Sequence, residues 1–189
     1  DLSAQTSLDS SIFDKLPKGL KFETGRRVVF TGGRFSQEIL NKELNYILML
    51  EIMRGYGVFN LYLDSSNAFL LSRLIQMYSK DMMIDVANYI ENTGTLIRTG
   101  GAAECLLSTG VGDDQFIEIE ENKVFILPLD LENPARLSVK SNVLGMIDVR
   151  THGGKVGLIF DTRTDGSSIY SDVKLFNDCI KQFINILKK

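Results

Sequence analysis

The sequence predicts an α/β fold: a parallel βαβα unit, then a small all-β barrel or sandwich, and last a C-terminal amphipathic helix. Three observations lead to this prediction. Residues 26–92 alternate short apolar runs with apolar residues at helical spacing. Residues 93–168 hold short β-rich runs between turn residues, and residues 169–189 carry the cleanest amphipathic pattern in the chain. Residues 1–25 are mixed in character and form a lead-in segment.

The α/β part is expected to begin with a strand over residues 26–31. Its run VVF is typical of a strand that is covered on both faces, and it ends at the pair Gly32 and Gly33. A helix is expected to follow over residues 36–54, with Ser36 as a candidate N-cap. Its second half is so apolar that most of its circumference must be buried.

A second strand is expected over residues 58–63, and the sequence DSS at 64–66 offers caps for the next helix. That helix is expected over residues 67–78. One face at helical spacing contains Asn67, Leu71, Leu74, Ile75 and Tyr78. A further helix is expected from about 82 to 90. The order of strand, helix, strand, helix indicates a parallel sheet with right-handed crossovers.

The β-rich part has short runs of strand-forming residues, separated by Gly, Asn, Asp and Pro. The expected strands cover residues 95–98, 115–119, 123–127, 135–140, 146–150 and 156–160. Strands this short and this closely spaced are typical of a barrel or a sandwich. From residue 171 onward, apolar residues recur at intervals of three and four. This pattern predicts a final helix that packs back on the domain.

Composition excludes several classes of protein. With 21 Lys and Arg against 24 Asp and Glu, the net charge is −3, so no basic footprint for nucleic acid is present. No apolar run approaches the roughly 20 residues of a membrane-spanning helix, and the first residues are too polar for a signal peptide. We therefore expect a cytoplasmic protein with neither a membrane nor a nucleic acid as partner.

The glycine pair Gly32 and Gly33 has two interpretations. A strand that ends in glycines lets the base or sugar of a nucleotide lie on bare main chain, because no Cβ blocks the approach. On spacing alone, such a pair is more often a tight turn with positive φ and no ligand. Asp64 is similarly ambiguous. It ends a strand where open α/β sheets place ligand-facing side chains, but it can instead cap the following helix.

Other candidates lie in the β-rich part. Asp113 and Asp114, beside alternating glycines, have the residue types of a magnesium site, although such a stretch is more often a solvated loop tip. Cys105 and His152 have the residue types of a nucleophile and its base. Their ordinary interpretations are a buried thiol and an exposed turn residue.

The pair Asp161 and Arg163 follows the strand at 156–160. Two residues apart on a strand, the two side chains share a face. They are expected to form a structural salt bridge, and an anion site is the alternative. The two cysteines, Cys105 and Cys179, fit no metal-binding spacing, and one histidine is too few for a usual zinc site. We expect both thiols to be reduced.

Five segments, VVFTGGRFSQ, LYLDSSNAFLLSRLIQM, NTGTLIRTGG, ILPLDLENPARLSV and GGKVGLIFDTR, appear in an order that resembles a known family. It is the MutL-type accessory proteins of cobalamin-dependent glutamate mutase, which reactivate that enzyme and are unrelated to the mismatch-repair protein of the same name. The resemblance covers roughly residues 27–166 and corresponds to the C-terminal part of the family. The family in turn resembles the actin, sugar kinase and Hsp70 ATPases.

The resemblance implies that Gly32 and Gly33 contact the adenosine of ATP and that the β-rich part contacts a cobalamin-dependent mutase. The D-x-G-x-T hairpin by which such ATPases grip phosphates is absent from the sequence, so this chain alone is not expected to hydrolyse ATP. We therefore expect a non-catalytic C-terminal fragment of an ATPase-like accessory protein, which binds ATP only as part of an intact parent.

Two other functions are compatible with the sequence. The first is an interaction or oligomerisation module without a nucleotide, in which the apolar helix at 36–54 lies against another subunit of a homo-oligomer. The second is a small thiol-dependent or magnesium-dependent enzyme that uses Cys105 or the pair Asp113 and Asp114.

Overall fold

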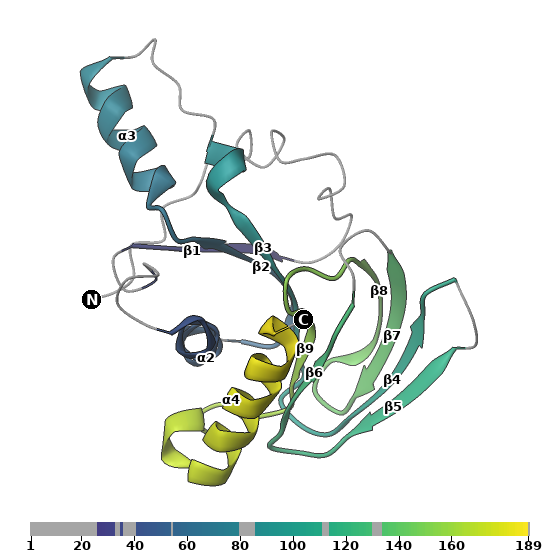
Figure 1. Ribbon diagram of the computed structural model, residues 1–189. Helices are drawn as coiled ribbons and strands as arrows, with labels where there is room; N and C mark the ends of the chain where they lie inside the picture. Colours follow the sequence, from purple (N-terminus) through teal and green to yellow (C-terminus); the bar gives the residue numbers. More distant parts are fainter. Residues whose placement is uncertain are drawn as a thin grey trace.

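The computed structural model describes residues 26–32, 35, 41–53, 55–79, 86–110, 114–129 and 134–188. They form two β-sheets that pack face to face, with helices on the outer side of the first sheet (Figure 1). Sheet A has the strand order β1-β2-β3-β9-β6, and sheet B has the order β5-β4-β7-β8. The predicted fold class, an α/β unit followed by a β-rich part and a C-terminal helix, is confirmed.

Sheet A begins with the predicted parallel unit. Strand β1 (Arg26–Thr31) pairs in parallel with β2 (Gly57–Asp64), and α2 (Lys42–Ile52) connects them. The next strand, β3 (Glu91–Arg98), runs antiparallel to β2, so the sheet is mixed. Because β3 starts at the edge where β2 ends, the segment between them returns to the same edge and does not cross the sheet.

That return segment contains α3 (Ala68–Tyr78) and the short 3-10 helix η3 (Val86–Tyr89). The helix expected at 82–90 is thus a single short turn within the described residues, and residues 80–85 lie outside them. Helix α3 projects beyond the edge of sheet A instead of covering one of its faces (Figure 1).

The β-rich part supplies strands to both sheets. Strands β6 (Val124–Leu127) and β9 (Gly157–Asp161) extend sheet A, where β9 runs parallel to β3 and antiparallel to β6. Sheet B is antiparallel and contains β4 (Ala103–Ser108), β5 (Gln115–Ile119), β7 (Ala135–Ser141) and β8 (Gly145–Thr151). Strand β4 was not expected. The boundary expected between residues 92 and 93 lies inside β3. It does not separate the two sheets, because β6 and β9 of the β-rich part belong to sheet A.

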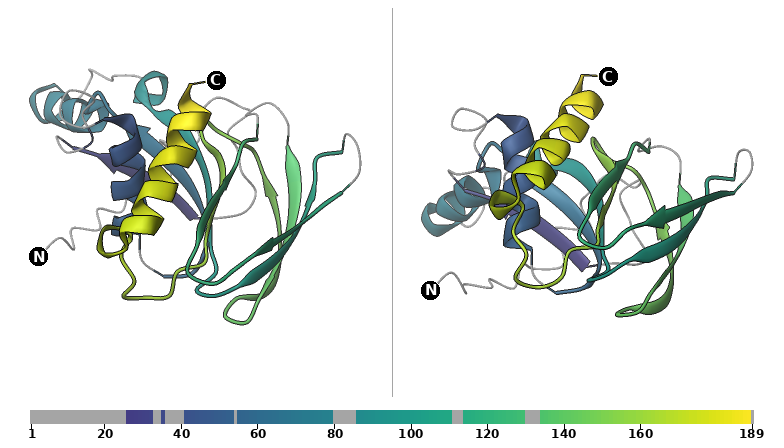
Figure 2. Two further views of the ribbon diagram at one scale, coloured as in Figure 1. Left: turned by 60° about the horizontal axis from the view of Figure 1, so that its bottom comes forward. Right: turned by 90° about the horizontal axis from the view of Figure 1, so that it is seen from below.

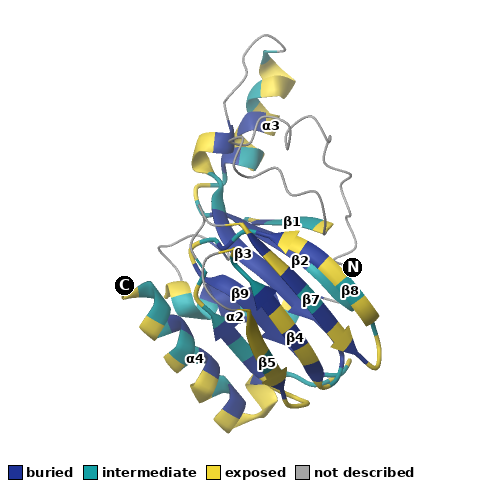
Figure 3. Ribbon diagram, turned by 90° about the vertical axis from the view of Figure 1, so that its right-hand side faces the viewer, coloured by how far each residue is buried: buried dark blue, intermediate teal, exposed yellow. Residues whose placement is uncertain are grey.

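The core has two layers, one on each side of sheet A. Helices α2 and α4 (Val173–Leu187) cover one face (Figure 2), with Leu50, Leu61 and Phe183 among the fully buried residues. Sheet B covers the other face, where Leu158 and Leu137 are fully buried. The outward residues of sheet B alternate with its buried ones, so this sheet presents one face to solvent (Figure 3).

Close contact between main chains is possible only because certain positions are glycine. An added Cβ on Gly154 would lie 2.6 Å from the main-chain nitrogen of Gly94, and one on Gly157 would lie 2.3 Å from the carbonyl oxygen of Leu127. These approaches bring the loop before β9 against β3 and β6.

The exposed edge of strand β6 is covered by a side chain of α4. The amide of Gln182 accepts a hydrogen bond from the N–H of Ile126 at 2.9 Å and donates one to the carbonyl oxygen of Val124 at 3.0 Å. It satisfies an outward donor and an outward acceptor, as a neighbouring strand would. This removes part of a free strand edge of the kind that promotes aggregation.

Candidate functional site

Strands β1 and β2 end side by side at one edge of sheet A, where α3 begins. The hydroxyl of Thr31 donates a hydrogen bond to Oδ2 of Asp64 at 2.8 Å, and the N–H of Gly32 donates to Oδ1 of Asn67 at 3.1 Å. The C-terminal edge of parallel strands is the usual ligand position in α/β sheets. The structure thus brings Gly32 and Asp64, two of the candidate site residues, to one edge, while Gly33 lies outside the described residues.

The carboxylate of Asp64 is fully buried and caps α3. Its Oδ1 accepts hydrogen bonds from the N–H of Ala68 at 2.8 Å and from the hydroxyl of Ser66 at 3.2 Å. Its Oδ2 accepts from the N–H of Phe69 at 3.0 Å, in addition to the bond from Thr31. The sequence left two interpretations of Asp64, a ligand-facing side chain or a helix cap. The hydrogen bonds of the carboxylate are those of a helix cap. The candidate cap Ser36 lies outside the described part of the chain.

Gly32 leaves open space above the main chain. Its φ is +111°, a conformation that favours glycine, and an ideal Cβ there would have no described atom within 4 Å. A flat ring could rest on this turn without meeting a side chain of the described residues.

A buried ionic network lies elsewhere, where β3 and β9 end. Asp161 accepts two hydrogen bonds from the guanidinium of Arg163 and one from its N–H, and Arg163 also pairs with Glu51 of α2. The guanidinium of Arg98 approaches the same Asp161 and donates to the carbonyl oxygen of Met53 at 2.7 Å. Asp161 and Arg163 thus form the expected structural salt bridge.

The protonation of this network follows from its contacts. Burial alone would lower the pKa of Arg163, but the hydrogen bonds and charges of Asp161 and Glu51 raise it. Burial acts to raise the pKa of Glu51, yet the N–H of Ile169, the hydroxyl of Ser168 and Arg163 together hold it below its usual value. These contacts hold Arg163 and Glu51 in their ionised forms.

The candidate nucleophile and base lie in different surroundings. Cys105 is buried in the apolar core between the two sheets, and burial raises the pKa of its thiol to about 12, which makes it a poor nucleophile. His152 follows β8, and its carbonyl oxygen accepts a hydrogen bond from the hydroxyl of Thr95. Cys179 is likewise buried, and burial raises the pKa of its thiol to about 12.

The candidate magnesium site is only partly described. Asp114 is exposed, and Asp113 lies outside the described residues. Within the ranges that the structure covers, no three His, Cys, Asp or Glu side chains gather closely enough to hold a metal ion.

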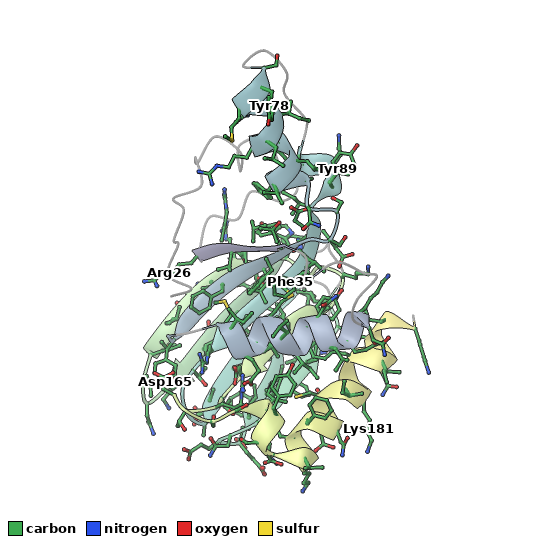
Figure 4. All side chains as sticks on the ribbon, turned by 90° about the vertical axis from the view of Figure 1, so that its left-hand side faces the viewer. Arg26, Phe35, Tyr78, Tyr89, Asp165 and Lys181 are labelled. Atoms are coloured by element: carbon green, nitrogen blue, oxygen red, sulfur yellow. The ribbon has the colours of Figure 1, made fainter. Side chains whose placement is uncertain are left out.

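Helix α3 carries a surface that the sequence did not identify. Its large apolar side chains point away from the domain: Met77 is 79% exposed and Tyr78 91%, and in Figure 4 Tyr78 lies far from the sheets. We name this surface the α3 stripe, and its members are Leu70, Leu71, Leu74, Met77 and Tyr78. Only Ala68 and Ser72 of α3 are buried. Leu71, Leu74 and Tyr78, which the sequence places on one face of the helix, belong to this exposed surface.

A second apolar group lies on the outer face of sheet B. Leu106 of β4 is directly opposite Phe116 of β5, and the two are 42% and 61% exposed. Such cross-strand pairs contribute to the stability of a sheet.

No family model, curated protein or solved structure matches this chain. No helix among the described residues is long and apolar enough to cross a membrane.

Proposed function

We propose that this chain is a non-catalytic interaction module that binds another protein through the α3 stripe. The observation that carries the proposal is a helix with five large apolar side chains turned to solvent. Contiguous exposed apolar patches on folded domains mark sites of protein contact. The spacing of Leu70, Leu74 and Met77 is the spacing by which an amphipathic helix anchors itself in a groove.

The N-terminal end of α3 is held in place by hydrogen bonds to sheet A. The carboxylate of Asp64, at the end of β2, accepts four hydrogen bonds. One comes from Thr31 at the end of β1, and the others come from Ser66, Ala68 and Phe69 at the start of α3. Helix α3 is therefore fixed at its N-terminal end, while the α3 stripe remains exposed for contact with another protein. A rigid helix loses little conformational entropy on docking.

The resemblance to MutL-type accessory proteins suggests a cobalamin-dependent mutase as the partner. The test is the affinity of the purified chain for such a mutase, measured by biolayer interferometry. We expect Leu74→Asp to weaken binding at least about tenfold, as for a central apolar anchor. Gln76→Asp adds the same charge on another side of α3 and is expected to change the affinity less than about twofold.

A third variant separates α3 from sheet B. Phe116→Asp places a charge on the outer face of sheet B and is expected to leave binding unchanged. If Phe116→Asp abolishes binding while Leu74→Asp does not, the partner docks on sheet B, and the proposal is wrong about the surface.

A second candidate function is a contribution to an adenosine site, favoured by the open space above Gly32. ATP would be gripped at its phosphates by another part of an intact parent protein, since this sequence lacks D-x-G-x-T. The chain alone is expected to show a shift of the amide resonances of Thr31 and Asn67, beside Gly32, with millimolar adenosine. Gly32→Ala should remove the response. Gly145→Ala, at another glycine with positive φ and open space, should keep it.

A further inference from the structure

We propose that the α3 stripe also docks on the α3 stripe of a second copy of this chain, in an antiparallel two-fold pair centred on Leu74. This inference rests on the proposed function, because it names one occupant of the same surface. Helix α3 projects beyond the edge of sheet A (Figures 1 and 4), and its stripe is exposed among the described residues.

The order of residues in α3 favours self-pairing. In an antiparallel two-fold pair, residues equally far before and after the central residue lie opposite each other. With Leu74 at the centre, Leu70 meets Tyr78 of the second copy and Leu71 meets Met77. Leu74 meets its own copy. All five members of the stripe thus meet only other members of the stripe, and no polar residue is buried between them.

The charges of α3 point to the same occupant. The helix sequence AFLLSRLIQMY has a single charged residue, Arg73. At about 100° per residue, Arg73 lies about 100° around the helix from Leu74, at the side of the stripe. Its guanidinium can stay in water when two stripes meet. Two uncharged stripes can meet without burying a charge. A basic or acidic groove on another protein would find no opposite charge within the stripe.

The expected dimer is weak. One helix of 11 residues offers a small area compared with a standard stable interface. We expect a dissociation constant of roughly 10–100 µM. The same surface would then be free for another protein at low concentration.

Disulfide trapping tests the geometry. Two facing helices at about 8–10 Å bring central Cα atoms to about 3.4–5.4 Å, which overlaps the range that a disulfide spans. Under mild oxidation, Leu74→Cys is expected to give at least about tenfold more linked dimer than Gln76→Cys. Gln76 lies about 160° around the helix from Leu74. The native Cys105 and Cys179 are buried, with thiol pKa values of about 12, so they provide little background.

Sedimentation velocity tests the equilibrium without oxidation. The wild-type chain is expected to pass from monomer to dimer between about 1 µM and 1 mM, while Leu74→Asp remains a monomer. Equal trapping of the two cysteine variants, or a wild-type chain that stays monomeric, would overturn the inference. If the wild type stays monomeric but Leu74→Asp loses the mutase, only this inference fails. If Leu74→Asp binds the mutase as wild type does, the proposed function fails.

Discussion

Arg163 and Asp161 form a bidentate ion pair in which neither side chain is more than 1% exposed. Nε of Arg163 lies 2.9 Å from Oδ1, and Nη2 lies 2.8 Å from Oδ2. Nε of the buried Arg98 lies 3.5 Å from the same Oδ2. One carboxylate therefore faces two buried guanidinium groups at the ends of β3 and β9.

Removal of that carboxylate is expected to destabilise the fold strongly. Asp161→Asn keeps the shape but leaves both arginines without this charge, at a cost of about 3–5 kcal/mol. Urea denaturation gives the free energy of unfolding. The matched control is Glu104→Gln, which breaks the exposed pair with Lys140 and should cost less than about 1 kcal/mol. If Asp161→Asn lowers the free energy of unfolding by no more than Glu104→Gln does, the buried network does not stabilise the fold.

Glu51 makes stability depend on pH. Its folded-state pKa is lowered, so in acid the unfolded chain takes up protons first. The stabilisation is complete above the ordinary glutamate pKa of 4.5 and is lost as the pH falls through the lower folded-state value. We expect Glu51→Gln to be less stable than wild type at neutral pH, and the difference to shrink as the pH falls below about 4.5. Urea midpoints across this range measure it, and a constant difference would contradict the assignment.

The contact of Gly154 with β3 is expected to tolerate no side chain. Gly154→Ala places a Cβ 2.6 Å from the main-chain nitrogen of Gly94, which cannot move freely, so the free energy of unfolding should fall by about 1–3 kcal/mol. Gly101→Ala is the control, because an ideal Cβ there has nothing within 4 Å. Thermal unfolding followed by circular dichroism compares the two. Similar melting temperatures would mean that the loop before β9 can move away from β3.

Asp64 is expected to control the order of α3 more than that of the rest of the domain. Asp64→Ala removes the acceptor of the N–H groups of Ala68 and Phe69, which costs about 1–2 kcal/mol for a helix cap. Hydrogen exchange of α3 amides should therefore accelerate. Asp172→Ala removes the cap of α4 instead and should leave exchange in α3 unchanged. Unchanged α3 exchange in Asp64→Ala would refute the capping role.

Much of the fold follows from local patterns in the sequence. Alternation and apolar runs locate β2, β5 and β7 closely, and helical spacing locates α3 and α4. Strand direction is not a local property. Strand β3 runs antiparallel to β2, and within the described residues only the 3-10 turn η3 represents the helix expected at 82–90. The unexpected strand β4 contains Cys105, whose buried side chain the sequence did predict.

The candidate site was predictable only in part. A strand end followed by glycine places Gly32 correctly. Three of the four groups that donate to the Asp64 carboxylate lie within five residues of it, whereas the contact with Thr31 spans 33 residues and is not a local property. The α3 stripe shows the general limit most clearly. Helical spacing identifies an apolar face at Leu71 and Leu74, and only the tertiary arrangement shows that these two side chains stay 49% and 44% exposed.

Hydrogen–deuterium exchange of the wild-type chain tests the central claim, that α3 is the docking element, most directly. Exchange is compared at low and high protein concentration and with the mutase added. We predict that protection increases in peptides from α3, residues 68–78, in at least one of these conditions, and that peptides from β4 and β5 do not change. Protection confined to β4 and β5, with α3 unchanged throughout, would contradict the account.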